Sequence, residues 1–89
     1  MDNKILFVDD DVLILEGYRR MLHQEFSVST AIGGQQALAL LRASGPFAVV
    51  ISDMRMPGMN GAEFLANVRE KAPDTVRMLL SPLQDSRDH

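Results

Sequence analysis

An unbroken apolar run ends abruptly in acids near the start of the chain, at Ile5-Leu6-Phe7-Val8-Asp9-Asp10-Asp11. Apolar character that is continuous rather than alternating is typical of a strand covered on both faces. Beyond the acids the apolar residues recur at helical spacing, as Ile14, Tyr18 and Met21 do. Asp11 suits the N-cap of that helix, because its side chain can accept a backbone N–H and its charge favours a helix N-terminus. The stretch therefore predicts a buried strand that leads directly into a helix.

Strand and helix patterns alternate along the rest of the chain. Further apolar runs predict strands at residues 27–31, 47–51 and 76–80. Segments rich in helix formers, each with one apolar face, predict helices between them at residues 35–42 and 62–71. This order predicts an α/β fold: a doubly wound parallel sheet with right-handed crossovers and helices on both faces. In such sheets ligands bind at the carboxyl ends of the strands.

Length and composition exclude several classes of protein. The chain has 89 residues and a net charge of −3, which fits one domain and argues against binding nucleic acid by charge alone. It has no cysteine, so it forms no disulfide scaffold and no thiolate metal site. Its apolar runs are far shorter than the ~20 residues of a membrane span, and its start resembles a strand rather than a signal peptide. We therefore expect a cytoplasmic protein with no membrane and no direct nucleic-acid partner.

Acidic residues follow two of the predicted strands. Asp9 and Asp10 come directly after the first strand, and Asp53 follows the third. If these strands are neighbours, the carboxylates face one crevice, where two of them ~5 Å apart repel by about 3 kcal/mol. A cation would relieve this repulsion, and oxygen ligands with room for water suit Mg²⁺ best, then Mn²⁺ or Ca²⁺. The alternative is that these acids are solvated loop residues and helix caps, which is the interpretation we favour for Asp11.

One segment is more specific than the rest, Ile51-Ser52-Asp53-Met54-Arg55-Met56-Pro57-Gly58-Met59-Asn60-Gly61. An acid closes an apolar strand, a proline follows four residues later, and a glycine follows eight residues later. Together with the acidic pair Asp9-Asp10 and a fourth strand that ends at Ser81, this segment resembles the receiver domain of two-component response regulators. The resemblance extends from Lys4 to Ser81 and implies a flavodoxin-like fold.

The resemblance implies a phosphoacceptor signalling domain rather than an enzyme. Asp53 would accept a phosphoryl group from a sensor histidine kinase. Asp10 and Asp53 would bind Mg²⁺ directly, Asp9 would bind it directly or through water, and the backbone carbonyl of Arg55 would complete the ligands that the protein supplies. Ser81 would hydrogen-bond the phosphoryl group.

The chain departs from the family after the fourth strand. A receiver normally continues with two more helices and a fifth strand, whose terminal lysine contacts the phosphoryl group. Neither Lys4, at the wrong end of the sheet, nor Lys71 can replace that lysine. We therefore expect a partial receiver over residues 1–81 and a polar tail over residues 82–89, with a homo-oligomer formed through the open edge of the fourth strand. The alternative function is a non-phosphorylatable remnant that acts as a binding or oligomerisation module.

Overall fold

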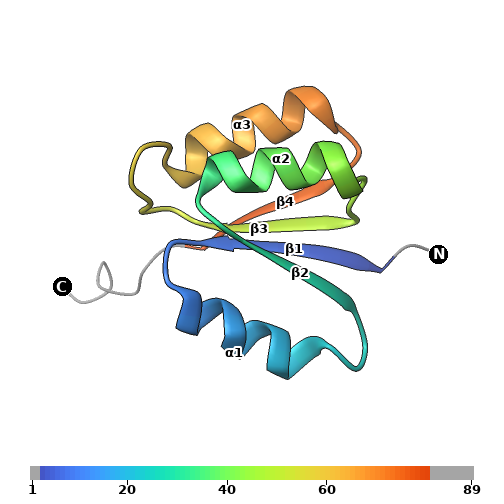
Figure 1. The fold of residues 1–89 in the computed structure, drawn as a ribbon. Helices are drawn as coiled ribbons and strands as arrows, with labels where there is room; N and C mark the ends of the chain where they lie inside the picture. Colours follow the sequence, from blue (N-terminus) through green and yellow to red (C-terminus); the bar gives the residue numbers. More distant parts are fainter. Residues whose placement is uncertain (1–2, 81–89) are drawn as a thin grey trace, which may run out of the picture.

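Four parallel strands alternate with three helices in the structure, a computed structural model that describes residues 3–80 (Figure 1). The strands and helices follow one another as β1 Lys4–Asp9, α1 Val12–Leu22, β2 Ser27–Ile32, α2 Gly34–Ser44, β3 Val49–Asp53, α3 Gly61–Lys71 and β4 Val76–Leu80. The strand order in the sheet is β2-β1-β3-β4. Helix α1 covers one face, and α2 and α3 lie together on the other (Figure 1). The predicted doubly wound α/β fold is confirmed.

The hydrophobic core is split between the two faces of the sheet. Alternate residues of β1 serve each side, which explains why its sequence is continuously apolar. On the α1 side, Ile5 and Phe7 pack with Leu15, and the ring of Phe7 stacks on Tyr18 with centroids 4.4 Å apart. The larger cluster, under α2 and α3, consists of Leu6, Val8, Ala31, Ala37, Leu38, Phe47, Val50, Met56, Phe64 and Val68. Burial on both faces holds β1 at the centre of the domain.

Polar caps set the starts of two helices. The Asp11 carboxylate accepts the backbone N–H of Leu13 at 2.9 Å, so the predicted cap of α1 is confirmed. At α3, the Asn60 side chain accepts the N–H of Glu63 at 2.9 Å, and the Glu63 carboxylate accepts the N–H of Asn60 at 3.0 Å. This reciprocal pair is a capping box, which satisfies two backbone donors that a helix start otherwise leaves free.

The third strand differs from its predicted span. It runs from Val49 to Asp53, two residues later than the predicted 47–51. Phe47 is nevertheless buried, and its carbonyl accepts a hydrogen bond from the Thr75 hydroxyl at 2.8 Å. The apolar run begins before the strand ladder because Phe47 packs into the core ahead of the first β1–β3 pair, Ile5 with Val49. An apolar run indicates which residues are buried, but it does not indicate where strand pairing begins.

Within residues 3–80, no helix covers β4 on the α1 side of the sheet. The register pairs Val49 with Val76 and Ile51 with Met78, on the face where α1 packs against β1. Val76 and Met78 are 56% and 47% exposed, and within residues 3–80 β4 pairs only with β3. The predicted boundary at residue 81 and the predicted tail, residues 82–89, lie outside the described residues. No helix of the described part is long and apolar enough to cross a membrane.

Candidate functional site

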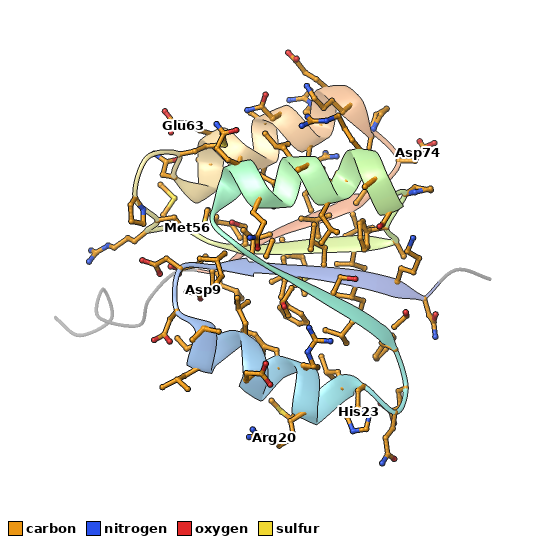
Figure 2. The ribbon with its side chains drawn as sticks, in the orientation of Figure 1. Asp9, Arg20, His23, Met56, Glu63 and Asp74 are labelled. Carbon is orange, nitrogen blue, oxygen red and sulfur yellow. The ribbon has the colours of Figure 1, made fainter. Side chains whose placement is uncertain are left out.

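Three carboxylates meet where the central strands end. Because β1 and β3 are parallel neighbours, with Val8 opposite Ser52, their carboxyl ends lie at the same edge of the sheet. Figure 2 labels Asp9 at this edge, at the turn from β1 toward α1. Asp9, Asp10 and Asp53 each offer a carboxylate oxygen, and these oxygens all lie within 4.8 Å of one another. The gathering predicted from strand order is therefore confirmed.

The three acids differ in their surroundings. Asp9 is buried at 7% exposure, Asp53 is half-buried and Asp10 is exposed. Burial raises the pKa of the Asp9 carboxyl above its ordinary value, and the nearby charges of Asp53 and Asp10 add to the rise. The backbone N–H of Asp11 opposes the rise by donating to Asp9 Oδ1 at 3.0 Å. A buried carboxylate beside two others is therefore costly to ionise without a cation.

The donor set fits a hard divalent cation. All three side-chain donors are carboxylate oxygens, which Mg²⁺ and Ca²⁺ prefer, and the exposure of Asp10 leaves room for water ligands. A shallow pocket of about 500 Å³ opens beside Asp10, and the β3–α3 loop forms its other walls, with Met54, Arg55, Met56, Pro57 and Asn60. Arg55 thus lies at this edge, as predicted, whereas Ser81 lies outside the described residues.

A close backbone approach supports Asp53. The N–H of Gly61 donates to the Met54 carbonyl at 2.8 Å, which holds the start of α3 against the end of β3. A Cβ atom at Gly61 would lie 2.2 Å from the Asp53 carbonyl oxygen, so only glycine fits. Glycine is favoured at position 58 for a different reason: its φ of +79° lies in the left-handed region, which other residues rarely adopt. The sequence pattern includes Gly61 but does not predict its close approach to Asp53. The sequence feature that marks this close approach is the position of Gly61, eight residues after Asp53.

A buried hydroxyl near the site was also missed. Ser52 is fully buried, and its Oγ donates to the Asp53 carbonyl at 2.9 Å. Sequence inspection treats a serine at the end of a strand as ordinary polar surface. The hydrogen bond gives the backbone of Asp53 a second partner beside the carboxylate cluster.

Fold and site together define a doubly wound α/β protein with three clustered carboxylates at the carboxyl edge of its sheet, a donor set that suits a metal ion. The family model for the response regulator receiver domain matches residues 5–89, so the chain belongs to the response regulator receiver family. It is a receiver domain of two-component signalling, and receivers as a class are phosphoacceptor signalling modules rather than enzymes.

Curated relatives and solved structures agree with this assignment. The chain is 43% identical over 84 residues to the hydrogenase transcriptional regulatory protein HoxA of Cupriavidus necator, covering 94% of the chain and 17% of HoxA. A structure described as adenylate cyclase from Rhodopirellula baltica matches with a TM-score of 0.91 and 41% identity, over 96% of this chain and 63% of that one. The response regulator TrrA of Thermotoga maritima, solved in complex with Mg²⁺ and BeF, matches with a TM-score of 0.83 and 33% identity, over 98% of this chain and 75% of that one. The chain thus spans about a sixth of the length of HoxA.

Proposed function

We propose that this chain accepts a phosphoryl group on Asp53 from a sensor histidine kinase in the cytoplasm, in a reaction that depends on Mg²⁺. The observation that carries the proposal is the set of three carboxylates within 4.8 Å, with Asp53 half-buried at the end of β3. TrrA, a relative of this chain, was solved with Mg²⁺ and BeF. Asp10 and Asp53 would hold the ion directly, Asp9 directly or through water, and Arg55 through its backbone carbonyl.

The transfer is a simple exchange of bonds. A carboxylate oxygen of Asp53 forms an O–P bond while the P–N bond to the kinase histidine breaks, and the imidazole leaves neutral with one proton from solvent. When bound, Mg²⁺ supplies charge neutralisation, which such transfers need more than covalent assistance. The chain contributes the nucleophile and its position at the edge of the sheet. Ser81 would hydrogen-bond the phosphoryl oxygens.

Intact mass tests the proposal directly. After incubation with acetyl phosphate and Mg²⁺, the chain should gain one phosphoryl group, and excess EDTA should abolish the gain. Asp53→Asn should remove it, whereas Asp11→Asn should retain it, because asparagine still caps α1. A full-length receiver serves as the positive control. The proposal fails if this control is phosphorylated and the chain is not.

A second candidate function follows from the face of β4 that no helix of residues 3–80 covers. The exposed side chains of Val76 and Met78, and an edge of β4 that pairs with no other strand of residues 3–80, favour a module that pairs with other copies of itself. In this alternative the chain binds partners or oligomerises without being phosphorylated. A two-fold pair through β4 would continue the sheet across both copies.

Light scattering over a dilution series tests the oligomer. We expect a dimer or larger species that dissociates when Met78→Lys places a charge on that face of β4. Glu70→Lys, on the exposed part of α3, is the matched control and should leave the mass unchanged. A stable monomer at all concentrations would contradict the alternative.

A further inference from the structure

We propose that the guanidinium of Arg55 binds the phosphoryl group that Asp53 receives. The inference rests on the proposed function and adds the residue that neutralises the incoming charge. It concerns the side chain of Arg55, whereas the expected metal ligand is the backbone carbonyl of the same residue.

Among residues 3–80, the topology leaves Arg55 as the one lysine or arginine at the acidic edge. Helices of a doubly wound sheet run back toward the amino ends of the strands, so their last turns lie far from Asp53. The other lysines and arginines of residues 3–80 lie at strand starts or in the last turns of helices: Lys4, Arg19, Arg20, Arg42, Arg69, Lys71 and Arg77. Arg77 is further occupied, because it donates to the carbonyl of Thr75 at 3.1 Å. Within the described part of the chain, only Arg55 is a cation of the site.

The Arg55 side chain is available. It is exposed and lies two residues after Asp53, in the loop that forms a pocket with Asp10. Within residues 3–80, its guanidinium makes no hydrogen bond or ion pair, even with the neighbouring carboxylates. An unpaired guanidinium presents a planar set of donors that matches two oxygens of a phosphoryl group.

The negative charge of the phosphorylated site favours a role for the Arg55 guanidinium in neutralising it. The site already holds three carboxylates, and the phosphoryl group adds further negative charge to the same edge. A divalent ion offsets part of this charge, and a flexible cation that approaches from the loop offsets more. The competing interpretation is a solvated surface arginine, which would leave every property of the phosphoryl group unchanged.

The test uses acetyl phosphate, so that no kinase interface contributes. A carboxylate oxygen of Asp53 forms the O–P bond, the P–O bond to the acetyl group breaks, and acetate leaves with the electron pair. Time courses of intact mass give the maximal rate constant of phosphorylation, the KM for acetyl phosphate and the lifetime of the phosphorylated chain. Wild type is compared with Arg55→Met, Arg55→Lys and the matched control Arg69→Met, which removes an exposed arginine from the far end of α3.

We expect Arg55→Met to raise KM about tenfold, the loss typical of one charge-assisted contact. Arg55→Lys should recover part of this loss, and Arg69→Met should match wild type. KM of wild type should rise with ionic strength, and that dependence should flatten in Arg55→Met. Circular dichroism melts check that each variant folds like wild type.

Two results overturn the inference in distinguishable ways. If wild type is phosphorylated and Arg55→Met keeps its KM and salt dependence within twofold, Arg55 does not bind the group and the proposed function stands. If wild type takes up no phosphoryl group while the full-length receiver does, both the inference and the proposed function fail.

Discussion

Burial opposes the charge of Asp9, a carboxyl that is 7% exposed. Its folded-state pKa is raised, so ionising it costs more in the folded chain than in the unfolded one. In the metal-free chain, the free energy of unfolding contributed by Asp9 is highest below its ordinary pKa of about 4. It falls as pH rises through the raised value.

Asp9→Asn should therefore stabilise the metal-free chain at pH 7, where the wild-type carboxyl must be ionised against its raised pKa. The asparagine oxygen can still accept the N–H of Asp11, so the turn is kept. Urea unfolding in EDTA measures the gain, which should shrink toward zero near pH 3. A gain that persists in acid would show that a change in packing, rather than the removed charge, is responsible.

Gly61 gives the second prediction at this scale. Gly61→Ala should destabilise the chain by about 2 kcal/mol, because the added Cβ meets the Asp53 carbonyl oxygen at 2.2 Å. Gly17→Ala is the matched control: nothing lies within 4 Å of its added Cβ, and alanine favours the interior of α1. It should stabilise by about 1 kcal/mol. Equal effects of the two substitutions in urea unfolding would contradict the close approach.

The stability of helix α3 depends on the capping box at its N-terminus. Asn60→Ala removes the acceptor for the Glu63 N–H and should cost about 1 kcal/mol of unfolding free energy. Asn60→Asp keeps an acceptor in place and should cost much less. Thermal melts of the two variants provide the comparison, and a loss of equal size in both would mean that the capping box does not anchor α3.

Element order was predictable from sequence, whereas contacts between elements were less so. The continuous run of β1 and the helical spacing after it sufficed for the alternating fold, and the rule for parallel sheets brought Asp9 and Asp53 together. The start of β3 was misplaced because Phe47 is buried by side-chain packing outside the ladder. The approach of Gly61 to Asp53 depends on where α3 docks, and no local pattern encodes that position.

At the scale of the whole molecule, metal binding should couple to folding. Mg²⁺ at ten times its dissociation constant should raise the free energy of unfolding by about 1.4 kcal/mol, since the acids gather only in the folded chain. Asp10→Asn should weaken this response, whereas Asp74→Asn, at the opposite edge of the sheet, should retain it. The test is the urea midpoint of unfolding measured at increasing Mg²⁺ concentrations. Equal responses in both variants would argue against binding at the acid cluster.

The separation of charge along the strands also bears on how the chain meets a partner. Over residues 3–80, every lysine and arginine except Arg55 lies toward the ends where the strands begin, and the carboxylate cluster lies where the strands end. Such a molecule carries a permanent dipole moment along the strand axis. In the field of a positively charged partner, such a molecule turns its acidic end toward that partner before contact. Orientation by a long-range field, in addition to complementary shape, then sets the association rate at low salt.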